Sequence, residues 1–281
     1  MELSPLRAES ISRILAADYH PWIGNTMTSP GTNLLLSALH TETRNSLLKH
    51  ATPVELPFGT VLFEVGKQPR YAYFLLSGLA SIVVTVADGA SAEVSMAGPE
   101  AVIGGEHLLG SARIPSHCVM QLNGSALRVS FSQLQAEFAA SAELRTVTLR
   151  LLQVQFAAMA QIAACNRLHT AEQRLARWLL TAQDKTQATS LKFTHEYLAQ
   201  MIATQRSTVT VVASELQDRN YIEYTRGTIH ILNRAGLETA ACSCYSVVRT
   251  LDSGVRAVME SEHARGVGHD GSSSRDSAGI S

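Results

Sequence analysis

Residues 140–167 constrain the fold of this chain most, because they contain neither glycine nor proline and follow a strict helical spacing. Mostly apolar side chains recur at alternating steps of three and four residues: Leu144, Val147, Leu151, Val154, Ala158, Gln161, Cys165 and Leu168. This spacing predicts one helix of about 40 Å with a stripe that a partner must cover. The stripe can be covered either by a second copy of the helix or by the chain's own N-terminal half. The length of the helix and the small residues in the stripe favour the first alternative, a dimer through residues 140–168.

Short β-rich segments separated by proline and glycine precede this helix. After a helical pattern at Leu34–Lys49, they lie at Val54–Leu56, Thr60–Glu64, Tyr71–Ser77, Ala80–Val86, Ala92–Met96, His117–Gln121 and Ser125–Ser130. Many short strands at close spacing predict an antiparallel barrel or roll over residues 34–139. The length of 281 residues, with 46% hydrophobic residues and a net charge of -1, agrees with a soluble protein of two domains.

The two ends of the chain differ from this pattern. Residues 1–33 are predicted to be a flexible N-terminal arm, and the glycine- and serine-rich residues 251–281 a disordered tail.

The start of the chain does not resemble a signal peptide, and no uncharged apolar stretch is long enough for a bilayer. We therefore expect a cytoplasmic protein without a membrane partner, whose four cysteines are reduced thiols.

A pair of short helices is predicted after a further helix at Thr170–Gln183. Thr194 is expected to cap the first, His195–Ile202, and Thr204 the second, Gln205–Arg219. A turn at Ala203 would make them a helix-turn-helix, whose second helix enters the major groove of DNA. Helix pairs also occur in proteins that never bind DNA, and five basic against four acidic residues in 191–236 do not settle the matter.

The candidate DNA-reading residues lie at the start of the second helix and on the hairpin that follows it. On the helix the exposed positions are Gln205, Arg206, Ser207, Thr210 and Val211. Arg206 can form the bidentate pair with guanine that discriminates best between bases. Tyr221–Tyr224 and Thr228–Ile231 predict a two-stranded wing with Arg226 at its tip, where it can contact a phosphate.

The segment FTHEYLAQMIATQRSTVTVVASELQDRNYI resembles, without a gap, the helix-turn-helix of the Crp/Fnr family of bacterial regulators. Matching residues are Thr194, Leu198, Ala199, Arg206, Thr208, Val209, Leu216 and Asn220–Ile222. Upstream, AEQRLARWLL is similar to the family's helix between coil and reading head, and FGTVLFEVGKQPRYAYFLLSGLASIVV to its cyclic-nucleotide-binding roll.

This resemblance implies an α+β fold: an N-terminal antiparallel β-roll, a long dimerisation helix and a C-terminal winged helix-turn-helix at 169–250. It implies a homodimer on an inverted-repeat operator in double-stranded DNA, with RNA polymerase as a further partner. Arg206 would read guanine, and Thr194, Gln205 and Thr208 would lie near phosphates. Many members have an acidic residue at position 207 and arginine at 211; Ser207 and Val211 therefore predict a different half-site.

The roll departs from the family's nucleotide binders at its phosphate site. Gly105 and Glu106 match the Gly-Glu that begins the family's phosphate cassette, where the glutamate takes the ribose hydroxyl. The Arg-Ser pair that would neutralise the phosphate is replaced by Ser116 and His117, and Arg113 lies three residues short. We therefore expect no cyclic nucleotide, and no cofactor. Members with an iron–sulfur cluster carry cysteines near the N-terminus, where residues 1–33 have none.

The cysteines and histidines suggest no other chemistry in the sequence. Cys165 would face its own copy across a dimer, as a packed thiol in preference to an intersubunit disulfide. Cys242–Ser243–Cys244 lacks the spacer of a metal site and is expected to pack a final helix, so no metal site is predicted. His117 and Cys118, on one strand, point to opposite faces and disfavour haem.

No catalytic motif is present, so we expect no enzyme. The alternative is a nucleotide-responsive subunit that uses its helix pair to contact a protein.

Overall fold

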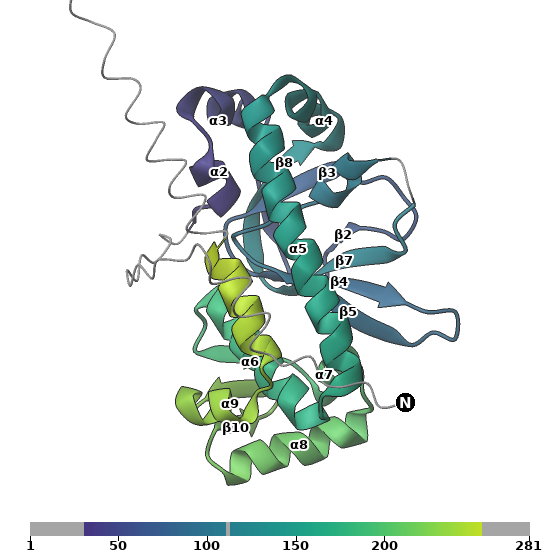
Figure 1. Ribbon diagram of the computed structural model, residues 1–281, viewed down its shortest axis with the longest axis vertical. Coiled ribbons are helices and arrows are strands. Elements are labelled where there is room, and N and C mark those ends of the chain that lie inside the picture. Colours follow the sequence, from purple (N-terminus) through teal and green to yellow (C-terminus); the bar gives the residue numbers. More distant parts are fainter. Residues whose placement is uncertain (1–30, 111–112, 255–281) are drawn as a thin grey trace, which may run out of the picture.

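The structure, a computed structural model, describes residues 31–110 and 113–254. The long helix α5 (Ala142–Leu168) runs along one side of the molecule, beside a β-roll above and a smaller domain below (Figure 1). The lower domain is called the reader domain here. This arrangement confirms the predicted α+β class. The predicted arm lies outside the described residues except for its last three positions.

The roll consists of two four-stranded antiparallel sheets. Their orders are β1-β8-β3-β6 and β2-β7-β4-β5. The strands are β1 (Thr52–Leu56), β2 (Val61–Phe63), β3 (Tyr71–Leu75), β4 (Leu79–Thr85), β5 (Ser91–Ala97), β6 (Val102–Ile103), β7 (Ser116–Leu122) and β8 (Gly124–Ser130). Seven were predicted close to these bounds, whereas β6 has two residues and no detectable alternation. Buried apolar side chains of both sheets, including Phe63, Leu75 and Met120, fill the roll.

Two short helices precede the roll where one was predicted. They are α2 (Leu34–Ala38) and α3 (Thr41–Leu48), separated by Leu39, whose backbone is extended at φ -83° and ψ 143°. Asn33 caps α2 and donates side-chain hydrogen bonds to the carbonyl oxygens of Leu75, Pro99 and Ala101. These bonds fix the start of the described chain to the roll.

The apolar stripe predicted for α5 faces the chain itself. After α4 (Phe131–Ala140), Ser141 caps α5, and Leu144, Val147 and Leu151 pack into the core formed with α2, α4 and the roll. Farther down, Ala158 and Ile162 line a cavity with Met96 of β5 and Val248. The predicted dimer seam is therefore wrong for Leu144, Val147 and Leu151, which the chain itself covers, whereas Leu168 at the end of the stripe is 74% exposed. Periodicity reveals an apolar stripe but not what covers it.

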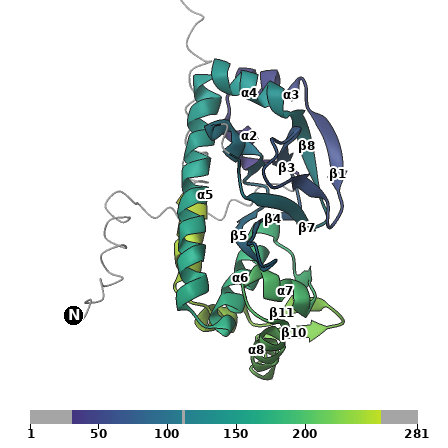
Figure 2. The same cartoon turned by 90° about the vertical axis from the view of Figure 1, so that its right-hand side faces the viewer.

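A different face of α5 is open to solvent. Phe156 is 74% exposed and Leu149 42% exposed, and Figure 2 shows this helix along the edge of the molecule, with the roll on its other side. Its most apolar 18-residue window has a mean hydropathy of 1.2, so α5 is also long and apolar enough to span a bilayer, as are core helices of soluble proteins.

The reader domain follows α5. It comprises α6 (Ala171–Thr186), β9 (Ser190–Lys192), α7 (His195–Met201), α8 (Arg206–Asp218), β10 (Ile222–Thr225), β11 (Thr228–Ile231) and α9 (Arg234–Ala240). The strands form a sheet of order β10-β11-β9, in which β9 was not predicted. Residues 244–254 are helical, so the predicted disordered tail is wrong for 251–254. Asp252 there pairs with Lys185 at 2.9 Å, and residues 255–281 lie outside the described part.

One apolar core joins the reader domain to the roll. Leu79, Val83 and Met96 of the roll belong to the same buried cluster as Trp178 and Leu198 of the reader domain. Within this contact the indole Nε1 of Trp178 donates a hydrogen bond of 2.8 Å to Glu93 Oε1. Burial raises the pKa of Glu93 to about 7. The reader domain is therefore packed on the roll as well as joined to α5.

Candidate nucleic-acid interface

Two helices joined by a tight turn form the core of the candidate interface. The side chain of Thr194 accepts a hydrogen bond of 3.2 Å from the amide of Tyr197, which confirms it as the cap of α7. The turn needs a positive φ, which Ala203 adopts at 51°. Gln205, without a side-chain cap bond, occupies the N-cap of α8, so the prediction that Thr204 caps this helix is wrong.

The buried side of the two helices holds α8 in place and leaves its other side free. Leu198, Val209 and Leu216 are fully buried. On the outer side Gln205, Arg206, Ser207 and Thr210 are exposed, Val211 is 57% exposed, and Thr208 is half-buried. Figure 1 shows α8 along the lower end of the molecule, away from the roll. The predicted base-reading residues therefore share one accessible surface.

Arg206 stands at the first position of α8. Its guanidinium forms no hydrogen bond or ion pair with any residue in the described ranges. A guanidinium presents its donors in a planar fork, and the amides at a helix start add partial positive charge. This end of α8 is suited to a guanine edge or a phosphate.

His195, which the sequence analysis did not identify, connects α7, α8 and the hairpin. Its Nδ1 lies 3.0 Å from Thr210 Oγ1, and its ring stacks on Tyr224 with centroids 4.4 Å apart. Thr210 also donates to the carbonyl oxygen of Arg206. Burial and then the charge of Arg206 lower the pKa of His195, which favours a neutral ring. His195 therefore positions the start of α8.

The predicted wing is present as the hairpin β10–β11. Arg226 and Gly227 form its two-residue turn with φ of 51° and 79°, the positive values of a type I′ turn. Arg226 is exposed at the tip, with no bonded partner within the described chain. Tyr224 donates through Oη to the carbonyl of Phe193 at 3.0 Å and ties the wing to the segment just before α7.

The candidate effector residues of the roll lie in a different environment. Gly105 and Glu106 begin a short 3-10 helix, η1 (Gly105–Leu109). Glu106 is partly exposed as a residue, but its Oε1 is buried with no hydrogen-bond partner in residues 31–110 and 113–254, and burial raises its pKa to about 7. Arg113 is exposed, Ser116 is buried at the start of β7, and His117 is half-buried. No arginine in the described ranges forms an ion pair with Glu106.

Known protein families match both parts of the chain. The Crp-like helix-turn-helix domain matches residues 173–240, and the cyclic nucleotide-binding domain matches residues 53–141. Together the two matches include α8 with Arg206 and most of the roll. No curated protein matches the chain.

Solved structures share the fold at low sequence identity. A transcriptional regulator of the Crp/Fnr family from Eubacterium rectale is 17% identical with a TM-score of 0.60, covering 73% of this chain and 96% of that one. FixK2 from Bradyrhizobium japonicum is 16% identical with a TM-score of 0.59, covering 69% and 98%. A CRP-family transcriptional regulator from Thermus thermophilus is 22% identical with a TM-score of 0.58, covering 67% and 96%.

Proposed function

Because the chain belongs to the Crp/Fnr family of transcription regulators, we propose that it reads a palindromic DNA operator as a homodimer. The observation that carries this proposal is Arg206 at the start of α8, which is exposed and has no bonded partner among the residues that the structure describes. Each bidentate pair of an arginine with guanine contributes roughly 1 to 3 kcal/mol of discrimination between bases. RNA polymerase is the partner expected from the family.

The neighbours of Arg206 shape the half-site. Ser207 offers a hydroxyl that serves as donor or acceptor, Thr210, whose hydroxyl proton is donated to the carbonyl of Arg206, offers its methyl group and oxygen, and exposed Val211 suits a thymine methyl group. Thr194, Gln205 and Thr208 lie at the helix starts, where phosphates are bound, and Arg226 reaches a phosphate from the wing. Such a half-site differs from one read by an acidic residue at 207 and an arginine at 211.

We assign the dimer contact to the exposed face of α5 in place of the stripe predicted from sequence. Exposed residues recur there at alternating steps of four and three: Leu149, Gln153, Phe156, Ala160, Ala163 and Arg167. This is coiled-coil spacing, and an aromatic ring that is 74% exposed is costly to leave in water. The Phe156→Glu variant should be monomeric in analytical ultracentrifugation, with Val86→Glu, the same change at an exposed apolar residue just after β4, as its control.

We further propose that neither cyclic AMP nor an iron–sulfur cluster is the effector. The roll interior is filled by apolar side chains, and the buried oxygen of Glu106 has no cationic neighbour bonded to it within the described residues. A buried cyclic phosphate is best held by the permanently charged, bidentate fork of an arginine, which Ser116 and His117 cannot supply. The cluster-binding members' N-terminal cysteines are absent from residues 1–33.

The test is selection of bound duplexes from a random DNA pool at one fixed salt concentration. The intact chain should enrich an inverted repeat with guanine in each half, and Arg206→Ala should lose that guanine preference. Arg219→Ala is the matched control, because this arginine lies just beyond the far end of α8 and pairs with Glu172. Absence of any enriched sequence, together with DNA affinity that hardly falls with salt, would favour the protein-contacting alternative.

A further inference from the structure

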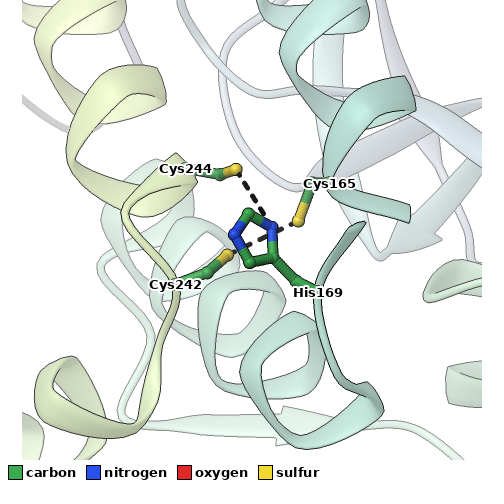
Figure 3. Close-up of side chains that lie close together, drawn as sticks. All are labelled: Cys165, His169, Cys242 and Cys244. Atoms are coloured by element: carbon green, nitrogen blue, oxygen red, sulfur yellow. Dashed lines mark hydrogen bonds between the residues drawn. The ribbon is translucent and has the colours of Figure 1, made fainter. Parts of the chain in front are cut away.

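Three cysteines and a histidine from distant parts of the sequence meet at the C-terminal end of α5 (Figure 3). Cys165 lies in the last turn of α5 and His169 is its C-cap residue. Cys242 and Cys244 come from the segment after α9. The Sγ atoms of Cys165 and Cys242 are 3.5 Å apart, as are Cys244 Sγ and His169 Nδ1. All four ligand atoms lie within 4.8 Å of one another, and the cysteines are buried.

The two separations of 3.5 Å match the edge of a tetrahedral metal site, and the other ligand atoms, all within 4.8 Å, need to close in by about 1 Å at most around an ion. Bonds of about 2.3 Å to sulfur and about 2.0 Å to nitrogen place the ligand atoms of a tetrahedron roughly 3.5 to 3.8 Å apart. An iron–sulfur cluster distributes its thiolates over several iron atoms and so holds them farther apart. A disulfide would bring two sulfur atoms to about 2.0 Å, whereas all four cysteines of the chain are free thiols.

The groups around the cluster also suit a metal thiolate site. Gln161 Nε2 donates a hydrogen bond of 3.0 Å to Cys244 Sγ, the kind of outer contact that orients a thiolate ligand. Three thiolates and a neutral imidazole around a divalent ion carry one net negative charge. The side chain of Arg177 is buried close enough to act electrostatically on Cys165, and its Nε and Nη2 have no hydrogen-bond partner in the described part of the chain. Its charge can compensate that of the site.

We propose that Cys165, His169, Cys242 and Cys244 bind one zinc ion. Soft thiolates with an imidazole in a closed tetrahedral set are the ligands of structural zinc sites. The ion joins the end of α5 to the segment that leaves the reader domain, so both ends of that domain are fixed at one point. The site does not depend on DNA binding, and it needs no residue of the DNA-reading surface.

Elemental analysis of the full chain, purified under reducing conditions without chelator, tests the proposal directly. We expect about one zinc per chain. After removal of zinc, added cobalt(II) should give a sulfur-to-cobalt charge-transfer band and the intense visible bands of a tetrahedral ion. Zinc should also raise the melting temperature of the stripped chain by several degrees, because it binds the assembled site of the folded chain more tightly than the separated cysteines of the unfolded chain.

The matched variants are Cys242→Ser and Cys118→Ser. Cys118 is equally buried but lies in the core of the roll, so its variant should keep the zinc and the cobalt spectrum while Cys242→Ser loses both. If Cys242→Ser fails to fold, the melting shift of the unmodified chain still decides. Metal far below one per chain, an octahedral cobalt spectrum, or a Cys165–Cys242 disulfide in the reduced preparation would each overturn the proposal.

Discussion

The reader domain and the roll place their charged groups in opposite ways, although the sequence of each resembles a domain that binds a negatively charged ligand. The reader domain leaves Arg206 and Arg226 exposed and without bonded partners in the described structure. The roll instead buries a carboxyl oxygen of Glu106, with no arginine paired to it among the described residues. An exposed cation remains hydrated until an anion arrives, whereas a buried carboxyl without a paired cation adds no positive charge for a phosphate bound beside it. Resemblance to a fold therefore does not by itself supply the positive charge that a cyclic phosphate needs.

The largest expected effect is on the free energy of unfolding and on its dependence on pH. The folded-state pKa of Glu106, about 7, lies above its ordinary value, so folding binds a proton between those two values and stability falls as pH rises through that window. Glu106→Gln removes the ionisable group and should stabilise the protein above pH 7 by on the order of 2 kcal/mol. Urea unfolding at acid and alkaline pH measures this, with exposed Glu55→Gln as the control. An unchanged pH dependence would contradict a buried, uncompensated carboxyl.

A smaller effect is expected at the wing. Arg226→Ala should weaken binding to all DNA sequences about equally and reduce the slope of log affinity against log salt by about one per chain, because one phosphate contact is lost. Fluorescence anisotropy over a range of salt concentrations measures the slope. A change in base preference instead would mean that Arg226 reads bases.

The smallest effect is expected from cyclic AMP, which should not change the thermal stability of the chain. Millimolar cyclic AMP should leave the melting temperature of the chain unchanged, because a ligand stabilises a fold only in proportion to its binding. Differential scanning fluorimetry measures the melting temperature, and a known cyclic-AMP-binding protein serves as the positive control. An increase of several degrees in the melting temperature would show that the roll binds the phosphate of cyclic AMP although Ser116 and His117 replace the family's Arg-Ser pair. The roll and the reader domain would then no longer differ in their capacity to bind a negatively charged ligand.

Local features of this protein could be predicted from sequence, and contacts between distant segments could not. Thr194 and the Arg226–Gly227 turn are set by neighbouring residues, so the helix pair and the wing were predicted close to their observed bounds. The partners of Leu144 and Val147 depend on how the roll folds back onto α5, which periodicity does not encode. Cys165 and Cys242 are 77 positions apart, so no spacing rule could bring them together.

The shared core between roll and reader domain makes the indole proton of Trp178 a reporter of domain opening. This proton is bonded to Glu93 inside the contact, and Trp178 is fully buried. Solvent can reach it only when the contact opens, so its hydrogen-exchange rate measures how often the reader domain separates from the roll. Slow exchange in the free chain and faster exchange on operator DNA would mean that binding consumes part of the free energy that holds the two domains together.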